Sequence, residues 1–476
     1  MVFSTPLFLF VYLSLTLLLY YAVPLKGRNL ALLAVSLFFY AWGERIYVVI
    51  MVASTLIDYT HGMLVERCKA RGNDRGARWA VASSVFFNLA LLGFFKYWDF
   101  LAASFQAVGL NFMPVLNIHL PIGISFYTFQ TMSYTIDVYR GDARAQRSLV
   151  NFGTFVTLFP QLIAGPIIKY KDLGDQIDSR TCTVEKFASG VQMFVIGLGK
   201  KVLIANNVGM LWESYKAMAP GDLTVAGAWL GVLAFAIQIY FDFSGYSDMA
   251  VGLGRMLGFE FMRNFNYPYI SRSITEFWRR WHISLSSWLR DYLYISLGGN
   301  RKGKLRTYGN LLVTMVLGGL WHGAAIRFIL WGTLHGVALA LHKLWMAVVP
   351  GAKASGAQMH WWSRAAGVFF TFNLVCLGWL MFRAESMQTV ELMLHQIFSN
   401  FNVPMIPQVI AGYAGVFALI GAGYLLHLMP GCVDRTAQRL VANAPLVLQV
   451  VMAAAMIWCV MQIKSSDIQP FIYFQF

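Results

Sequence analysis

Long apolar stretches alternate with short polar segments from one end of the chain to the other. Many of these stretches approach or exceed the ~18–20 residues that a helix needs to cross the hydrocarbon core of a bilayer. The pattern predicts an all-α polytopic integral membrane protein. The predicted apolar segments are 2–23, 30–43, 46–63, 79–95, 117–137, 149–168, 187–209, 224–249, 309–322, 326–349, 364–383, 408–428 and 440–463.

Two of these segments contain residue pairs that favour a break in the helix. One pair is Gly165-Pro166 and the other is Gly318-Gly319. Broken backbone at membrane depth needs a protein-lined cavity, because lipid offers no partner for free peptide groups. We therefore expect both segments to be re-entrant.

The basic residues of the short loops predict an orientation. Segment 64–78 carries Arg67, Lys69, Arg71, Arg75 and Arg78, and short loops rich in Lys and Arg remain in the cytoplasm. Counting spans in both directions puts two further basic segments, 26–28 and 140–147, on the same side and the N-terminus outside. The stretch 2–23 has no basic region before it, so we expect a first span rather than a cleaved signal.

Composition supports the membrane class and excludes several others. The 476 residues are 58% hydrophobic and 12% charged, against about 25% charged in soluble domains. The net charge of +15 is accounted for by basic cytoplasmic loops that meet anionic lipid, so membrane lipid is the expected partner and nucleic acid is not. The chain has no CxxC, HxxxH or GxSxG motif, and we expect no metal site and no serine nucleophile.

The stretch 260–307 is both basic and rich in aromatic residues. Ser273 and Glu276 form a capping-box pattern that predicts the start of a helix over 273–292. Trp278, Trp281, Leu285, Trp288 and Tyr292 would form its apolar stripe, and Arg279, His282, Ser286 and Arg290 its polar stripe. Such a helix lies at the cytoplasmic interface or lines a polar channel; a plain interfacial anchor is the alternative.

His322 is the strongest candidate for chemistry. It lies between glycines about 14 residues beyond Tyr308, which places it roughly 21 Å from the basic end of its segment. An imidazole there can act as a general base, although a core histidine bonded to a carbonyl fits equally well. His282 follows Arg279 and Arg280, which could hold an anionic ligand such as the phosphates of a coenzyme; an interfacial histidine is the alternative.

Other ionisable groups lie within apolar segments, where their cost makes each one a candidate site. For Asp242 and Asp248 a structural role is favoured over a place in a polar pocket. His119 and His335, with His342 and His427, are interpreted as structural or interfacial. The remaining groups are Asp58, Asp137, Lys200 and Lys201. This pattern fits an enzyme that joins a cytoplasmic donor to an acceptor across the membrane, and it fits a transporter almost as well.

Five ordered motifs distinguish these classes. Together they resemble the membrane-bound O-acyltransferase family, in the bacterial polysaccharide branch that includes alginate and cellulose acetylation proteins and, more distantly, the teichoic-acid D-alanyl transferase. The resemblance runs from Met1 to at least Lys343, and the rest of the chain matches only in general character. The motifs are Pro121–Phe129, Phe159–Ile167, Tyr240–Asp248, Phe277–Tyr292 and Gly319–Gly323.

The resemblance implies a single transmembrane domain over 1–476, most diagnostic over 117–345. Its expected fold has about eleven spanning helices plus re-entrant segments around a central funnel. It also implies that His322 is the catalytic histidine and His282 the second one. We expect the acyl donor near Arg279, Arg280 and Arg290, and a pocket that includes Trp321, Asp242, Ser286 and Tyr292.

The implied activity is O-acetylation of an exopolysaccharide such as alginate or cellulose, in the bacterial inner membrane. Acetyl-CoA is the expected donor substrate, no cofactor is held tightly, and a periplasmic acetyltransferase is the expected partner. D-alanyl transfer from a carrier protein is the alternative within the family, but the compact stretch 283–321 favours acetyl transfer. A transporter without acyl chemistry remains the alternative of a different class, and a structural subunit of an export complex would need no buried histidine.

Overall fold

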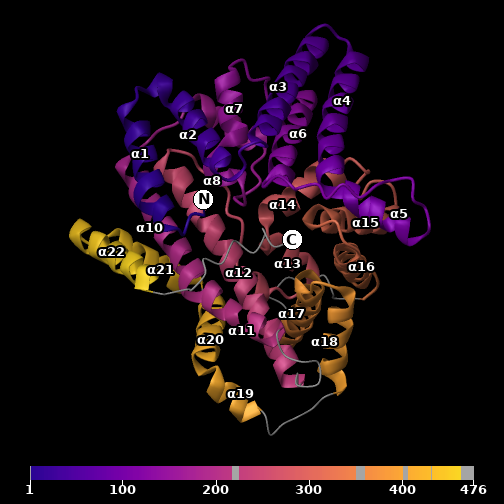
Figure 1. Ribbon diagram of the computed structural model, residues 1–476, viewed down its shortest axis with the longest axis vertical. Coiled ribbons are helices and arrows are strands. Elements are labelled where there is room, and N and C mark those ends of the chain that lie inside the picture. Colours follow the sequence, from indigo (N-terminus) through magenta and orange to yellow (C-terminus); the bar gives the residue numbers. More distant parts are fainter. Residues whose placement is uncertain (1, 217–224, 350–359, 400–405, 430, 463–476) are drawn as a thin grey trace. The chain divides into compact units, whose positions relative to one another are not determined.

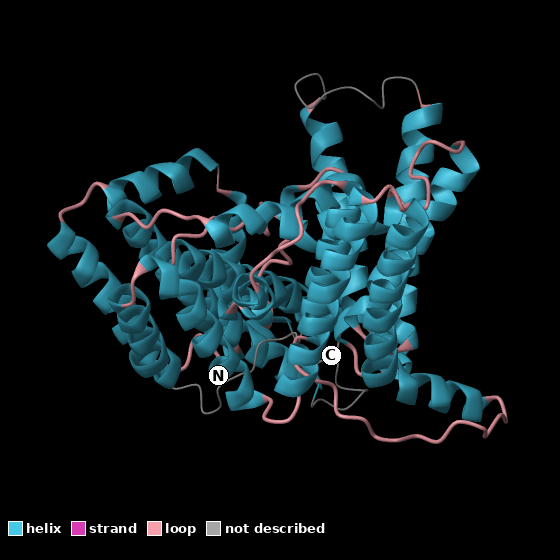
Figure 2. Ribbon diagram, turned by 90° about the horizontal axis from the view of Figure 1, so that it is seen from above, coloured by secondary structure: helices cyan, strands magenta, loops and turns pink. Residues whose placement is uncertain are grey.

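The computed structural model describes residues 2–216, 225–349, 360–399, 406–429 and 431–462, which form helices and loops with no strand (Figure 2). The chain divides into two compact units. The first unit comprises Met1–Phe194 and Ser247–Arg263, and the second comprises Val195–Tyr246 and Asn264–Phe476. The helices α10 and α12 each contribute residues to both units (Figure 1).

The first unit contains α-helices interrupted by short π-helical and 3-10 turns. Its elements are η1 (Leu7–Tyr12), α1 (Leu13–Ala22), η2 (Leu25–Gly27), α2 (Arg28–Gly43), α3 (Val48–Ala70), α4 (Asp74–Leu92), η3 (Gly93–Tyr97), α5 (Trp98–Ala107), α6 (Ile124–Arg140), α7 (Leu149–Thr157), α8 (Phe159–Leu162), α9 (Tyr170–Asp178) and most of α10 (Val184–Gly199).

The second unit holds the remaining helices. They are η4 (Lys200–Ala205), α11 (Asn206–Lys216), most of α12 (Val225–Met256), η5 (Pro268–Ile270), α13 (Ile274–Arg280), α14 (Ile283–Trp288), η6 (Leu289–Tyr294), α15 (Lys304–His322), α16 (Ile326–Val348), α17 (Trp361–Arg383), α18 (Met387–Ser399), α19 (Ile406–Gly412), α20 (Ala414–Leu428), α21 (Gly431–Ala442) and α22 (Leu446–Gln462).

Four helical stretches are long and apolar enough to cross a membrane: Val48–Ala70, Asp74–Ala107, Val184–Leu211 and Trp361–Arg383. They carry large exposed apolar side chains, Phe86 and Phe370 among them, as lipid-facing helices do. The prediction of an all-α multi-pass membrane protein is confirmed. The end residues 224 and 463 of two predicted segments lie outside the described residues.

A buried polar network joins α3, α4 and α6, which lie side by side in the first unit (Figure 1). The carboxylate of Asp58 accepts hydrogen bonds from Ser84 Oγ at 2.6 Å and from Asn88 Nδ2 at 2.7 Å. Thr131 Oγ1 donates to Asn88 Oδ1 at 3.0 Å. Because the buried groups satisfy one another, Asp58 has a packing role in this helix trio.

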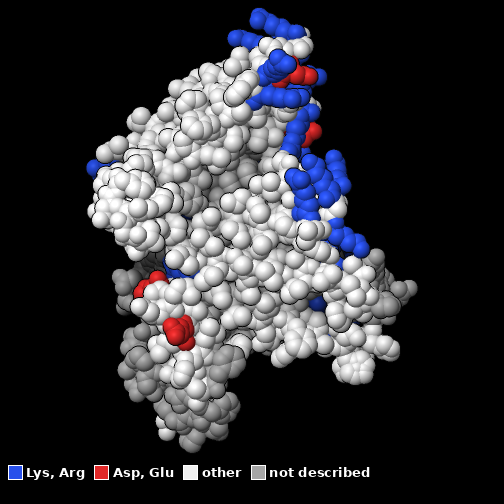
Figure 3. Space-filling model, turned by 90° about the vertical axis from the view of Figure 1, so that its right-hand side faces the viewer, with Lys and Arg blue, Asp and Glu red and all other residues white. Residues whose placement is uncertain are grey.

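The end of the α3–α4 hairpin is strongly basic, and Figure 3 shows its Lys and Arg side chains crowded together. The turn is fixed by Asn73, whose Oδ1 accepts the N–H of Gly76 at 2.9 Å and caps α4. This hairpin carries the basic segment 64–78 that the orientation argument starts from.

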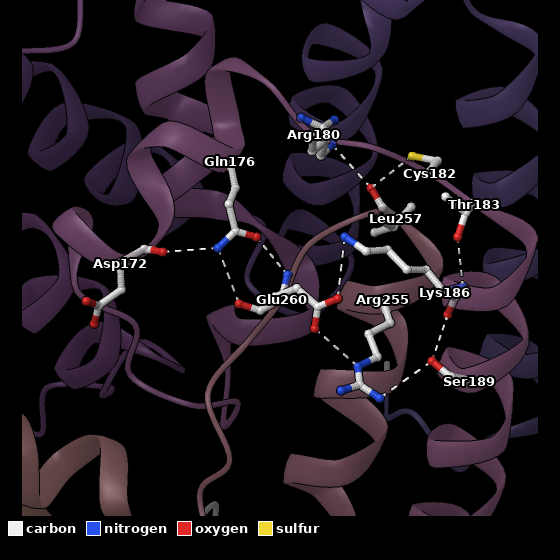
Figure 4. A network of polar contacts seen from close by, with 10 residues as sticks. All are labelled: Asp172, Gln176, Arg180, Cys182, Thr183, Lys186, Ser189, Arg255, Leu257 and Glu260. Atoms are coloured by element: carbon white, nitrogen blue, oxygen red, sulfur yellow. Dashed lines mark hydrogen bonds and ion pairs between the residues drawn. The ribbon is translucent and has the colours of Figure 1, made fainter.

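A second polar network fastens the end of α12 to α9 and α10 within the first unit (Figure 4). Glu260 pairs with Lys186 and with Arg255, each at 3.4 Å, and its N–H donates to Gln176 Oε1 at 2.7 Å. Arg180 Nε donates to the carbonyl of Leu257 at 3.2 Å. Half-exposed ion pairs contribute only about 0–1 kcal/mol each, so the backbone hydrogen bonds matter most here.

The two predicted breaks have different outcomes. In segment 149–168 the helix does break: α7 ends at Thr157, α8 is a single turn, and residues 163–169 continue as buried loop. At Gly165 a Cβ would lie 2.5 Å from Gln161 Cα, so only glycine fits this turn. The break predicted at Gly318-Gly319 is wrong, because α15 runs through both glycines to His322.

Candidate active site

The segment 273–292 begins as a helix where the capping pattern predicts. Ser273 Oγ accepts the N–H of Glu276 at 3.2 Å. The Glu276 carboxylate accepts the N–H of Arg272 at 3.0 Å, instead of that of Ser273 as in a standard capping box. Hydrogen bonds from Arg272 and Arg280 outweigh the effect of burial and lower the pKa of Glu276.

The prediction of one continuous helix over 273–292 is wrong. The first helix, α13, ends at Arg280, and His282 has a left-handed backbone with φ of 42°. A non-glycine residue in this conformation costs about 1–3 kcal/mol, so the surrounding structure must impose it. The break divides the predicted apolar stripe, because the buried Trp281 caps the end of α13 whereas the buried Trp288 is the last residue of α14.

Asn264 holds His282 in this position. Its Oδ1 lies 3.2 Å from His282 Nδ1 and also accepts the N–H and the hydroxyl of Ser284 at 3.1 and 3.0 Å. With Asn264 Oδ1 as the acceptor, Nδ1 carries the proton and Nε2 keeps a lone pair. The ring is 1% exposed, and Nε2 has no hydrogen-bond partner among the described residues.

His322 is the last residue of α15 and is 6% exposed. The rings of Trp321, Trp331 and Phe382 each lie 5.1 Å from its ring, centroid to centroid. Trp321 also lies 6.3 Å from the ring of His282. The two predicted catalytic histidines, from α15 and from the α13–α14 break, therefore share one aromatic wall.

Close packing of α15 on α16 fixes the position of His322. A Cβ on Gly319 would lie 2.2 Å from the carbonyl oxygen of Phe328, and one on Gly332 would lie 2.3 Å from that of Met315. The helices approach this closely only because neither glycine has a side chain, as at small-residue contacts between membrane helices. Gly319, one of the two glycines that suggested a break, is therefore a packing residue.

We expect Gly319→Ala to lower stability by about 1–3 kcal/mol and to reduce activity, because the added methyl forces apart the turn that carries His322. Gly309→Ala is the matched control on the same helix, because a Cβ at this position would meet open space. Since alanine favours the helix more than glycine does, this substitution should raise the free energy of unfolding by about 0.5–1 kcal/mol. Thermal unfolding in detergent measures both variants. Equal melting temperatures for the two would contradict the packing role.

Further polar atoms without partners lie behind His322. Trp331 Nε1 and both ring nitrogens of His335 have no hydrogen-bond partner among the described residues. His335 is fully buried, with its ring 4.8 Å from that of Trp331 and 5.2 Å from that of Trp278. Buried polar atoms are almost always paired, so this cluster fits the polar groups of a substrate or water. The sequence analysis interprets His335 as structural or interfacial. The one signal in the sequence for this cluster is the i, i+4 spacing of Trp331 and His335, which places both side chains on the same face of a helix.

The other predicted pocket residues have structural partners. The Asp242 carboxylate forms an ion pair with the ammonium of Lys201, and both side chains are buried. Ser286 Oγ donates to the carbonyl of Trp281 at 3.2 Å, and Tyr292 lies against Trp288 with ring centroids 5.1 Å apart. Trp321, also a predicted pocket residue, is in ring contact with both histidines.

The three predicted donor-side arginines differ in their surroundings. Arg280 pairs with Glu276 at 2.8 Å and donates to the carbonyl of Asn266 at 3.1 Å. Arg290 is exposed and pairs with Asp291 at 2.7 Å, and this hydrogen bond raises the pKa of its guanidinium. Arg279 is exposed on α13. Arg279 and Arg290 are thus the more exposed of the three.

Residues 138–388, just over half of the chain, match the model of the membrane-bound O-acyltransferase family. The chain belongs to this family. It is 48% identical over 403 residues to the probable alginate O-acetylase AlgI of Azotobacter vinelandii, covering 84% of this chain and 78% of that protein. It is 34% identical to a peptidoglycan O-acetyltransferase of Helicobacter pylori, covering 82% and 78% of the two chains.

A teichoic acid D-alanyltransferase of Streptococcus thermophilus is 31% identical over 284 residues, covering 55% of this chain and 68% of its own. These similarities confirm the bacterial polysaccharide O-acetyltransferase branch that the five motifs indicate. The chain is therefore a multi-pass membrane acyltransferase.

Proposed function

We propose that this protein transfers an acetyl group from acetyl-CoA across the membrane for O-acetylation of an exopolysaccharide, with His322 as the catalytic base. The observation that supports this most is the meeting of two buried histidines at Trp321, one of them with an unpaired Nε2. Both are the histidines that the motifs of the family indicate.

In the proposed reaction, His322 takes the proton of the acceptor hydroxyl while its oxygen attacks the thioester carbonyl carbon. The C–O bond forms, the C–S bond breaks, and the coenzyme leaves as a thiol that takes the proton back from His322. The indole N–H of Trp331 can donate to the oxygen of the tetrahedral intermediate. In an alternative, two-step mechanism the acetyl group is first transferred to the imidazole of His322 and then to the acceptor hydroxyl. His282 Nε2 can accept a hydrogen bond from another O–H or N–H group of a substrate.

We place the donor on the side of the exposed residues Arg279 and Arg290, because one guanidinium group can donate two hydrogen bonds to two oxygens of a phosphate. Arg280 forms an ion pair with Glu276, one turn earlier on α13, and so stabilises this helix. The donor is expected to be a substrate that comes and goes, so no cofactor remains bound between turnovers.

The names of the relatives guide the choice of acceptor. The chain is 48% identical to a probable alginate O-acetylase and 31% identical to the D-alanyltransferase. We therefore propose a polysaccharide hydroxyl such as that of alginate or cellulose, reached through a periplasmic acetyltransferase partner. D-alanyl transfer from a carrier protein is the alternative.

We also propose the family arrangement for the whole chain. It is a single domain over 1–476 in the bacterial inner membrane, with a periplasmic N-terminus and about eleven spanning helices around a funnel. The basic α3–α4 hairpin supports this orientation, because positive loops remain in the cytoplasm.

The donor is tested with the purified protein in lipid vesicles and acetyl-CoA labelled in the acetyl group. We expect release of free coenzyme A and appearance of label on a candidate partner added to the opposite side. A protein that consumes a D-alanyl carrier thioester and leaves acetyl-CoA intact would establish the alternative. Consumption of neither thioester with any partner would favour a transporter.

A further inference from the structure

The second unit contains a cavity of about 960 Å³ between α13, α17 and α20. One part of its lining is charged, with Arg272, Glu276, Arg280 and Arg364. The other part is apolar and includes Val368, Phe369, Phe372 and Leu428. Neither the proposed reaction nor the two buried histidines account for this cavity.

The charged part of the cavity is rich in hydrogen-bond donors. Glu276 neutralises one of the arginines, since it pairs with both Arg272 and Arg280, and Arg364 is exposed with no ion pair among the described residues. With three arginines and one carboxylate, the cavity has a formal charge of +2.

His427 adds a buried donor. Its Nε2 accepts the N–H of Tyr269 at 3.0 Å, so in the neutral ring the proton lies on Nδ1. This Nδ1 has no hydrogen-bond partner among the described residues, and the side chain is 1% exposed. Donors from two helices and one loop therefore converge on a site that suits an anion with several oxygens, such as a phosphate.

The position of the cavity on α17 indicates where its occupant comes from. The helix α17 is long and apolar enough to span the membrane, and it begins with Trp361 and Trp362, whose exposed rings stack with centroids 5.0 Å apart. Tryptophans at the end of a span mark the level of the lipid headgroups. Arg364 lies one turn into the helix, and Phe369 and Phe370 follow as exposed apolar side chains.

We propose that this cavity binds a phospholipid with an anionic headgroup from the surrounding membrane. Its phosphate lies between Arg364, Arg272 and His427 Nδ1, at headgroup level, and an acyl chain lies along Phe369, Phe372 and Leu428. Basic pockets between membrane helices bind anionic lipids in this way. A coenzyme would match the charges, but it would not account for an apolar wall that continues onto the exposed surface of a membrane span.

The proposal is tested by native mass spectrometry of the full-length protein in detergent with phosphatidylglycerol or phosphatidylcholine. We expect the wild type to retain phosphatidylglycerol in preference to phosphatidylcholine. Arg364→Gln should reduce this retention about tenfold, the value of one hydrogen bond to a charged group. Arg439→Gln removes a charge from α21 outside the cavity and should leave retention within twofold of the wild type.

Ala365→Trp provides a second variant that keeps every charge. It fills the cavity beside Arg364 and should displace the lipid as strongly as Arg364→Gln. Equal retention of the two lipids by the wild type, or equal losses in Arg364→Gln and Arg439→Gln, would overturn the proposal. Displacement of phosphatidylglycerol by coenzyme A would also overturn it, because it would assign the cavity to the donor. None of these measurements requires acyl transfer, so the result is independent of the proposed function.

Discussion

Replacement of His322 by alanine should reduce acyl transfer by about 10²–10⁴-fold, the usual contribution of a positioned general base. Its ring packs against the rings of Trp321, Trp331 and Phe382 at the end of α15, which hold the imidazole in position. The assay is release of free coenzyme A from acetyl-CoA, or of D-alanine from its carrier, by the purified protein.

Two variants make this test specific. His395→Ala removes an exposed histidine from α18 and should leave the rate unchanged. His322→Gln keeps a polar side chain of similar length, so it should preserve the melting temperature while it remains inactive. Full activity in His322→Ala would contradict the assignment of the base, whereas loss of activity accompanied by unfolding would point to a packing role.

Breaking the buried pair of Lys201 and Asp242 should lower stability by about 3–5 kcal/mol, because either single substitution removes one charge of the pair while the other stays buried. Lys201→Met and Asp242→Leu are the single variants. Their combination should recover most of the loss, since well-packed apolar residues often replace a buried ion pair at little cost. The measurement is thermal unfolding in detergent. We expect the wild type and the double variant to have higher melting temperatures than either single variant.

The matched control is Arg147→Met, which breaks the much more exposed pair of Arg147 with Glu66 and should change stability by less than about 1 kcal/mol. Single variants of Lys201 or Asp242 with normal melting temperatures but no activity would return Asp242 to the catalytic pocket. Such a result would support the pocket role that the sequence motif suggests for Asp242.

The membrane class could be predicted because its signal is local. Runs of apolar residues report a span without reference to the rest of the chain. The capping pattern at Ser273 and Glu276 also acts within one turn, and the structure has the helix start there. The five motifs indicated the family, which the comparisons confirm.

The positions of helix breaks could not be predicted from local sequence in the same way. Gly318-Gly319 suggested a break because glycine weakens an isolated helix, but contact with Phe328 of α16 makes glycine necessary at 319 in an intact helix. The good periodicity of 273–292 predicts one helix, yet Asn264 Oδ1 accepts hydrogen bonds from His282, which lies at the break, and from Ser284, which lies in the first turn of α14.

The sequence by itself determined that this protein is a helical membrane acyltransferase and which two histidines to examine. Only the tertiary structure decided how His282 is held, that Trp321 links it to His322, that Asp242 pairs with Lys201, and that arginines and aromatic residues from separate helices enclose a cavity. The physical reason is distance along the chain. Spans and caps depend on neighbouring residues, whereas these contacts join residues far apart in sequence that only the packed fold brings together.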